Sequence, residues 1–357
     1  MSKYDYGVFI GRFSPVHNGH VKVIKQALEE CDYLIVVVGS NNQARNTRNP
    51  FTASERMNMI QRAVEVGGCY NERVLYTSVG DYPYNDTLWL AEVQSAVDEV
   101  IADHHTHAEF TNSGWRDYKF NIALAGMYKD STSYYLNMFP QWSNSVAVSP
   151  GSEQGEILSA TGIRNNIFNG NLAYDKSLPD FVKLMISRDI EERPDIWKRL
   201  QSDWNYEQKY ESQWGKGPHV TVDAAVVQAG HILLIQRGQE YGHGLWALPG
   251  GFLNRRERIE DGVLRELREE TKLHVPEKVL RGSITAKRVY DSPYRSNRSH
   301  LITHCHRIAL SNVGKLPEVY GSDDAEKAKW VPLSKLDDMR NEFFEDHYHI
   351  IKDILNA

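Results

Sequence analysis

Residues 8–20 of this chain read VFIGRFSPVHNGH, and they carry the strongest structural signal of its first half. The apolar run at the start of this stretch is typical of a buried strand, and the amphipathic segment at 21–28 predicts a helix. Between them, Gly11 permits close backbone approach and Pro15 stiffens the chain. The stretch therefore predicts a strand, a tight turn and the beginning of a helix.

The two histidines of this turn have a spacing that suits phosphate. His17 and His20 are three residues apart, so both face one side of the first helical turn. A helix N-terminus carries unpaired N–H groups and about half a positive charge, which favours a bound phosphate. Two surface histidines in a loop are the alternative interpretation. The strand–turn–helix context and the motifs described below favour a functional pair.

The rest of the first half alternates strands with helices. Strands are predicted at 33–38, 73–79 and 121–126, and helices at 53–66 and 88–100. The run YLIVVV at 33–38 is typical of a parallel strand that is buried on both faces. This alternation predicts an α/β domain over residues 1–170, with a doubly wound parallel sheet and a ligand beyond the carboxyl ends of the strands.

Length and composition limit the classes of function. At 357 residues the chain is long enough for two domains. Its formal net charge of -6 gives no basic footprint, so we expect no nucleic-acid partner. Three scattered cysteines and the lack of a long apolar run predict a cytoplasmic protein with no membrane partner. A homo-oligomer is compatible with this composition.

A second motif of the first half is SATGIR at 159–164, which opens another predicted helix. Ser159 and Thr161 are favourable N-cap residues, and capping is one interpretation of both. Arg164 brings a guanidinium group, which pairs with phosphate in a bidentate way that Lys cannot copy.

The two motifs together resemble the His-x-Gly-His and Ser/Thr–Arg signatures of the nucleotidyltransferase superfamily. The resemblance implies a Rossmann-like domain in which two histidines and an arginine stabilise the triphosphate during nucleotidyl transfer. The residues implied as catalytic are His17, His20 and Arg164. Those implied to bind ATP and its phosphates are Gly11, Arg12, Phe13, Lys129, Ser159 and Thr161.

A further resemblance suggests the acceptor. NPFTASER at 49–56 is similar to a segment of the archaeal-type nicotinamide mononucleotide (NMN) adenylyltransferases, although capping alone explains Thr52. Asp81, Asn85 and Trp89 resemble the NMN-binding pocket of that family, in which Trp stacks on nicotinamide while Asn and Asp bind its carboxamide. Stacking of a cationic ring on indole contributes about 1–2 kcal/mol. Packing of Trp89 within its helix is an equally good interpretation.

The second half begins after a change in composition. Residues 171–217 lose strand character and are rich in aromatic side chains, which predicts a packed helical connector. Two strands at 220–228 and 231–237, joined by Ala-Gly, then predict a hairpin at the start of a domain over 218–357.

This second domain carries the motif GGFLNRRERIEDGVLRELREE at 250–270, which matches the spacing of the Nudix box. Glu266, Glu269 and Glu270 stand at i, i+3 and i+4, so three carboxylates share one helix face. Such a face favours hard divalent cations, and Mg²⁺, or Mn²⁺, fits the oxygen ligands. Glu257 is expected to support this metal site.

The resemblance implies an α/β/α Nudix hydrolase domain. Downstream, YDSPYRSNR at 290–298 resembles a segment of the ADP-ribose pyrophosphatases that are fused to NMN adenylyltransferases. Solvated loop arginines are the alternative interpretation of this segment. Lys272 stands where the Nudix box has Gly, and a side chain in that left-handed position costs about 1 kcal/mol. The residues implied to bind ADP-ribose are Gly250, Gly251, Arg295 and Arg298.

Nearly the whole chain thus resembles a bifunctional enzyme of NAD metabolism. The resemblance implies that one half converts ATP and NMN to NAD and pyrophosphate, and that the other hydrolyses ADP-ribose to AMP and ribose 5-phosphate. Two alternatives stay open at this point. The first domain could transfer a nucleotide to another phosphate, such as a pantetheine phosphate. The Nudix domain could act on another nucleoside diphosphate compound or serve as a ligand sensor.

Overall fold

The computed structural model describes residues 2–68, 71–107, 119–126, 135–147, 158–312 and 314–356. The chain divides into two compact units. The first unit comprises residues 1–42 and 48–194, and the second comprises residues 43–47 and 195–357. Five residues from the first half of the sequence therefore belong to the second unit.

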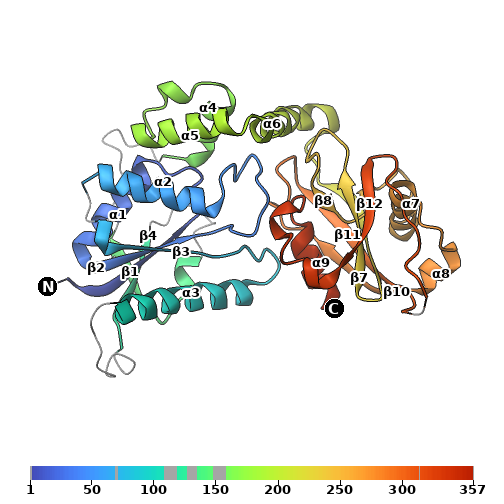
Figure 1. Ribbon diagram of the computed structural model, residues 1–357, viewed down its shortest axis with the longest axis horizontal. Helices are drawn as coiled ribbons and strands as arrows, with labels where there is room; N and C mark the ends of the chain where they lie inside the picture. Colours follow the sequence, from blue (N-terminus) through green and yellow to red (C-terminus); the bar gives the residue numbers. More distant parts are fainter. Residues whose placement is uncertain are drawn as a thin grey trace. The chain divides into compact units, whose positions relative to one another are not determined.

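The first unit is built on a five-stranded sheet in which every pair of neighbouring strands is parallel. Its strands are β1 (Tyr4–Gly11), β2 (Cys31–Val38), β3 (Val74–Ser78), β4 (Ile122–Gly126) and β5 (Ser143–Ala147). They lie in the order β3-β2-β1-β4-β5. Helices α1 (Asn18–Glu30) and α2 (Ala53–Val66) cover one face, and α3 (Asp86–His107) covers the other (Figure 1). The predicted doubly wound fold is confirmed, and β5 is a strand that the sequence pattern does not predict.

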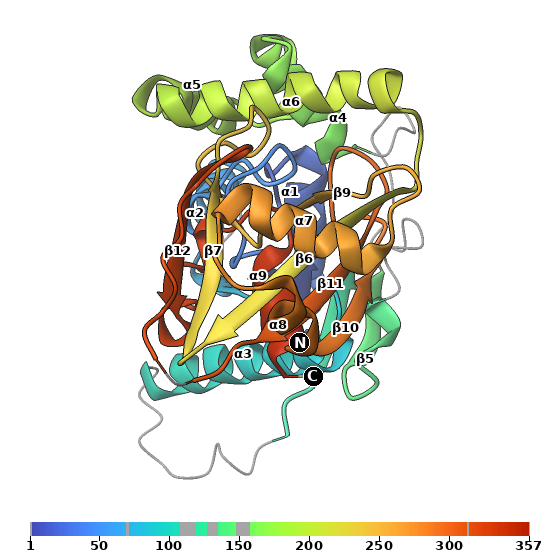
Figure 2. The same ribbon diagram turned by 90° about the vertical axis from the view of Figure 1, so that its right-hand side faces the viewer.

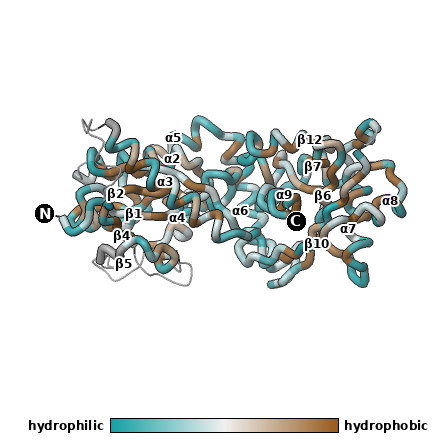
Figure 3. Tube along the Cα trace, turned by 90° about the horizontal axis from the view of Figure 1, so that it is seen from below, coloured by the Kyte–Doolittle hydropathy of each residue, from teal (hydrophilic) through white to brown (hydrophobic). Residues whose placement is uncertain are grey.

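The core of the first unit explains why β1 and β2 are central. Residues 34–38 of β2 are completely buried, as expected for a parallel strand covered on both faces. Side chains of the two central strands pack against Val93 and Val97 of α3. Hydrophobic residues follow one another along β1 and β2 (Figure 3). The unit is completed by α4 (Ala160–Phe168) and α5 (Asp180–Glu192).

The second unit is built on a mixed sheet in the order β10-β11-β6-β7-β12. These strands are β6 (His219–Gln228), β7 (His231–Arg237), β10 (Ile284–Tyr290), β11 (Leu301–Ala309) and β12 (Ala325–Pro332). Two short strands, β8 (Trp246–Ala247) and β9 (Gly250–Phe252), pair with β7 and β6. Helix α7 (Ile259–Thr271) lies on one face of the sheet and α9 (His347–Leu355) on the other (Figure 2). The remaining helices are α6 (Pro194–Trp214) and α8 (Glu277–Gly282).

The core of the second unit fixes α7 against the sheet. Val222, Ala224 and Val226 of β6 pack in one cluster with three residues of α7, which are Val263, Leu264 and Leu267. The predicted hairpin joins β6 to β7, and Ala229 and Gly230 both have positive φ, as a two-residue turn of this kind requires. The predicted α/β/α Nudix architecture is confirmed. No helix in the described part of the chain is long and apolar enough to cross a membrane.

Candidate functional sites

The turn after β1 brings the two histidines together at the N-terminus of α1. The rings of His17 and His20 are stacked with centroids 3.7 Å apart, and the backbone N–H of His17 donates to Nδ1 of His20 at 3.2 Å. A Cβ at Gly19 would lie 3.0 Å from the His17 ring, which explains the glycine between the histidines. The Phe13 ring packs edge-on against His20 at 4.9 Å. The turn thus presents two adjacent imidazoles at a helix N-terminus, where negative charge is favoured.

Arg164 is tied to this histidine turn. Its Nη1 donates to the carbonyl oxygen of Ser14 at 2.8 Å, and its Nη2 donates to the Thr161 hydroxyl at 3.1 Å. The Arg164 side chain is buried, so the cation lies beneath the turn rather than on an open surface. Ser159 caps α4, with its hydroxyl accepting from the N–H of Thr161 at 3.3 Å. The two signature motifs of the first half, 150 residues apart, are therefore joined by a direct hydrogen bond.

The residues proposed for the acceptor lie after β3, at the same edge of the sheet. The backbone N–H of Asp81 donates to Oδ1 of Asn42 at 2.8 Å, and Nδ2 of Asn42 donates back to the Asp81 carbonyl at 3.1 Å. This exchange joins the turn after β2 to the turn after β3. Asn85 is exposed, and its Oδ1 accepts from the N–H of Leu88 at 3.1 Å, so it stabilises the beginning of α3.

Trp89 lies at the margin of the core, where both sequence interpretations apply. The indole is half-buried and lies 5.8 Å from the Phe139 ring and 6.1 Å from the Tyr135 ring. It packs against the hydrophobic cluster of the first unit while part of its surface stays accessible. Lys129 lies outside the described residues.

The Nudix motif places its carboxylates where β9 meets α7. The backbone N–H of Gly250 donates to Oε2 of Glu270 at 2.8 Å. A Cβ at Gly251 would lie 2.6 Å from Oε1 of Glu266, so only glycine leaves room for that carboxylate. Burial raises the pKa of Glu270 to about 8, with the nearby Glu266 adding to the effect, and burial also raises the pKa of Glu266. Two crowded acids therefore lie one turn apart on the inner side of α7.

Arg265 bridges the other carboxylates of the motif. Its Nε donates to Oε1 of Glu257 at 2.8 Å, and its Nη1 donates to Oε1 of Glu266 at 2.7 Å and to Oε2 of Glu269 at 2.9 Å. The hydrogen bonds from Arg265 lower the pKa of Glu257. Arg265 is thus an orienting partner of all three acids.

The carboxylates of the Nudix motif have the chemistry of ligands for a divalent cation. Among the described residues, no three His, Cys, Asp or Glu side chains already converge as a metal site. The two buried acids nevertheless supply oxygen donors whose charged forms are disfavoured by burial, and Arg265 ties one of them, Glu266, to the carboxylates of Glu257 and Glu269. This donor set fits a hard divalent ion.

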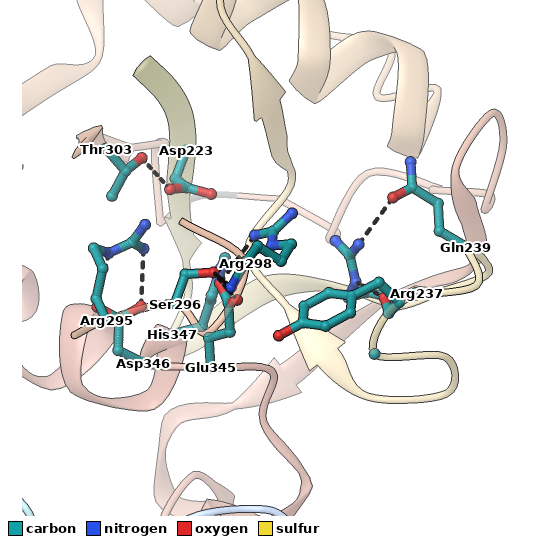
Figure 4. A network of polar contacts seen from close by, with 12 residues as sticks. Asp223, Arg237, Gln239, Arg295, Ser296, Arg298, Thr303, Glu345, Asp346 and His347 are labelled. Atoms are coloured by element: carbon teal, nitrogen blue, oxygen red, sulfur yellow. Dashed lines mark hydrogen bonds and ion pairs between the residues drawn. The ribbon is translucent and has the colours of Figure 1, made fainter. Parts of the chain in front are cut away.

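Both arginines of the downstream segment are held by buried carboxylates (Figure 4). Arg295 donates twice to Asp346, at 2.8 and 3.0 Å, and the two side chains are 2% and 7% exposed. Arg298 donates to Glu345 at 3.1 Å and lies over the rings of Tyr241 and Phe344. The alternative of solvated loop arginines does not describe them, and their proposed contact with ADP-ribose stays a prediction.

The sequence interpretation missed two buried side chains that support these sites. Arg56 of α2 contacts the turns after β1 and β2, and His347 at the start of α9 contacts the segment before Gly250. Arg56 ends the stretch 49–56, and His347 follows two acidic residues. In neither case does the neighbouring sequence indicate that the polar side chain is buried.

Comparison with known proteins agrees with this geometry. The cytidylyltransferase-like family model matches residues 8–166, and the NUDIX domain model matches residues 217–354. The nicotinamide/nicotinic acid mononucleotide adenylyltransferase of Acinetobacter baylyi is 31% identical over 216 residues, which are 60% of this chain and 97% of that protein. The nicotinamide-nucleotide adenylyltransferase of Pyrococcus abyssi is 30% identical over 180 residues, which are 50% of this chain and 82% of that protein.

Two solved structures match along the whole chain. The bifunctional NMN adenylyltransferase/ADP ribose pyrophosphatase from Francisella tularensis is 31% identical, with a TM-score of 0.86, and 99% of each chain is covered. A second structure of such a protein from that organism, complexed with AMP and Mn ion, matches with the same identity and coverage and a TM-score of 0.82.

Proposed function

This chain belongs to the family of bifunctional NMN adenylyltransferases/ADP-ribose pyrophosphatases, and we propose that it catalyses both reactions. The observation that carries the proposal is the match to a bifunctional enzyme over 99% of the chain, together with a sequence motif for each reaction. The first unit joins ATP and NMN to give NAD and pyrophosphate. The second hydrolyses ADP-ribose to AMP and ribose 5-phosphate.

In the first reaction the NMN phosphate attacks the α-phosphorus of ATP and pyrophosphate leaves. No side-chain nucleophile is needed, so the protein contributes positioning and charge stabilisation. His17 and His20 contact the phosphates from the N-terminus of α1, and Arg164 offsets charge on the leaving pyrophosphate from beneath the same turn. Gly11, Arg12, Phe13, Ser159, Thr161 and Lys129 complete the ATP site in this proposal.

NMN enters from the turn after β3 in this proposal. Asp81 and Asn85 bind the carboxamide and the exposed part of the Trp89 ring stacks on nicotinamide. The exchange of hydrogen bonds between Asn42 and Asp81 supports this assignment, because it connects the acceptor turn to the neighbouring turn after β2.

In the second reaction a water attacks a phosphorus of the diphosphate. Glu266, Glu269 and Glu270, with Glu257, would hold a divalent cation, for which we propose Mg²⁺ with Mn²⁺ as the alternative. When bound, such a cation polarises the diphosphate and lowers the pKa of water. Arg265 orients the carboxylates, and Gly250 fixes Glu270 through its N–H. Gly251, Arg295 and Arg298 complete the ADP-ribose site in this proposal. We also propose that the protein is cytoplasmic, in keeping with its few scattered cysteines.

Product analysis tests both activities in one protein. The protein is incubated with Mg²⁺ and either ATP plus NMN or ADP-ribose alone, beside the Arg164→Ala and Glu270→Gln variants. We expect NAD in the first reaction and AMP in the second, with each variant losing only its own activity. An inert NMN would overturn the acceptor assignment, and surviving ADP-ribose would overturn the hydrolase assignment.

A further inference from the structure

Arg56 is a completely buried cation in the first turn of α2. Its pKa is lowered to about 10 by burial, so the guanidinium stays charged at neutral pH. Two effects oppose this placement. Burial of a charge is costly, and the positive end of a helix dipole disfavours a cation in the first turn. A group in such a position needs a compensating set of contacts.

The compensation comes from backbone carbonyl groups of three different segments. Nη1 of Arg56 donates to the carbonyl of Arg12 at 2.6 Å and to that of Gly39 at 2.7 Å. Nη2 donates to the carbonyl of Ser40 at 3.0 Å, and Nε donates to that of Thr52 at 3.2 Å. One planar guanidinium therefore joins the turn after β1, the turn after β2 and the N-cap of α2.

The two turns that Arg56 joins are both locally strained. Phe13, next to Arg12, has φ of 51°, and Ser40 has φ of 57°. Residues with a side chain adopt this left-handed region at a cost, and the surrounding contacts must maintain it. β1 and β2 are neighbours in the sheet, and the N–H of Gly39 also donates to the Gly11 carbonyl at 2.9 Å. Arg56 supplies the side-chain donors that hold these carbonyls in place.

We propose that Arg56 is a positioning residue for adenylyl transfer, which sets the shape of the ATP-binding turns from behind. It is 0% exposed, so it cannot contact ATP itself. It acts through the backbone that carries Arg12 and Phe13 and through the adjoining turn at 39–40. This inference rests on the proposed function of the first unit and adds a residue to it.

The test compares Arg56→Lys with Arg62→Lys in the full-length protein. Lys keeps the charge of Arg56 but has one compact donor group that cannot span carbonyls of three segments. Arg62 is on the same helix with a 54% exposed side chain, so its substitution controls for a change of Arg to Lys in α2. The values of kcat and KM for ATP and for NMN are measured for each protein. The rate of ADP-ribose hydrolysis by the same preparation shows whether the second unit of each protein is folded and active.

We expect Arg56→Lys to lower kcat/KM for ATP by about tenfold or more, as loss of one or two well-formed hydrogen bonds would. The KM for NMN should change less than that for ATP, because Arg56 reaches the acceptor turn only indirectly, through the turn after β2 and Asn42. The rate of ADP-ribose hydrolysis should stay within about twofold of the parent, and Arg62→Lys should match the parent in every measurement. If Arg56→Lys keeps the parent kcat and KM for ATP, or changes the KM for NMN as much as that for ATP, Arg56 has no specific role at the ATP turns.

A second variant covers the case in which Arg56→Lys does not fold. Arg56→Gln keeps a planar group with two N–H donors but removes a charge that interacts with Asp81. For this variant the kcat and KM for ATP alone support or overturn the proposal. Parent protein that makes no NAD would overturn the proposed function itself. If the parent makes NAD and the Arg56 variant is equally active, only the role of Arg56 is overturned.

Discussion

The backbone N–H of Leu248 donates a hydrogen bond to Nδ1 of His347 at 3.0 Å. Burial lowers the pKa of the His347 imidazole to about 3, so the ring is neutral and Nδ1 is free to accept. Two residues after Leu248, the N–H of Gly250 donates to Glu270. His347 therefore supports the segment that positions a carboxylate of the Nudix motif.

Substitution of His347 should impair the hydrolase alone. His347→Asn keeps an acceptor near the position of Nδ1, whereas His347→Leu leaves the N–H of Leu248 without one. We expect the Leu variant to hydrolyse ADP-ribose about tenfold more slowly than the Asn variant, because an unsatisfied buried N–H costs about 1–3 kcal/mol. Steady-state hydrolysis and NAD synthesis by the same preparations measure this. Equal hydrolysis rates for the two variants would contradict a supporting role for Nδ1.

Gly251→Ala should displace Glu266. The new Cβ would lie 2.6 Å from Oε1 of that carboxylate, and one of the two groups must move. We expect a loss of ADP-ribose hydrolysis of about 10- to 100-fold and a higher Mg²⁺ requirement, as for other disturbances around metal ligands. Gly282→Ala is the matched control, because a Cβ there meets nothing within 4 Å. If Gly251→Ala requires the same Mg²⁺ concentration for ADP-ribose hydrolysis as the parent, the assignment of Glu266 as a metal ligand is refuted.

The sequence predicts the fold and the catalytic motifs because both depend on local patterns. The strand–turn–helix pattern around Gly11 and the fixed spacing of the Nudix box are short-range signals. β5 was missed because its sequence, SNSVA, is rich in small polar residues. The partners of Arg56 lie up to 44 residues away along the chain, so no local pattern separates it from an exposed arginine.

The arginines of the second unit show the same difference between local and long-range signals. Arg265 adjoins Glu266 within the Nudix motif, and in the structure it donates to Glu257, Glu266 and Glu269, all of which belong to that motif. The buried ion pairs of Arg295 and Arg298 depend on residues 345–346, which approach only in the folded chain. Their burial could not be read from a loop sequence rich in Ser, Asn and Arg.

Glu207 should make stability depend on pH. It accepts hydrogen bonds from Thr47 at 2.8 Å and from Tyr241 at 3.0 Å, yet burial raises its pKa to about 7. A carboxyl with a raised folded pKa contributes stability below its unfolded pKa and loses it as the pH rises through 7. We therefore expect the unfolding temperature of Glu207→Gln, relative to the parent, to rise between pH 5 and pH 8.

Thermal unfolding at pH 5, 6, 7 and 8 measures this difference. Glu211→Gln, at a 60% exposed side chain on the same helix, is the control and should follow the parent at every pH. A constant difference between Glu207→Gln and the parent across this range would show that Glu207 does not titrate there.

Lys272→Gly should stabilise the protein without changing its activities. Lys272 ends α7 with φ of 50°, where glycine has no steric penalty, so we expect a gain of about 1 kcal/mol in unfolding free energy. Lys272→Ala removes the same charge but keeps a Cβ, and it should show no such gain. The unfolding free energies of the two variants are measured from the urea-induced unfolding transition of the second unit. Equal stability of the Gly and Ala variants would show that φ imposes no cost here.

Trp89→Leu should separate the two interpretations of this residue. Leu retains part of the packing against Phe139 but offers no aromatic face. If nicotinamide stacks on the indole, the KM for NMN should rise about tenfold, from about 1–2 kcal/mol of lost stacking, while the KM for ATP stays the same. A lower unfolding temperature with an unchanged KM for NMN would assign Trp89 to packing alone.

The assignment of residues 43–47 to the second unit limits how this enzyme can be divided. The chain passes from one unit to the other after residues 42, 47 and 194. Thr47 donates to Glu207 and accepts from Asn297, so a fragment that starts at residue 195 loses the peptide that satisfies both. No single cut yields two complete halves. A simple truncation therefore cannot separate the two activities without removing the contacts that this segment makes.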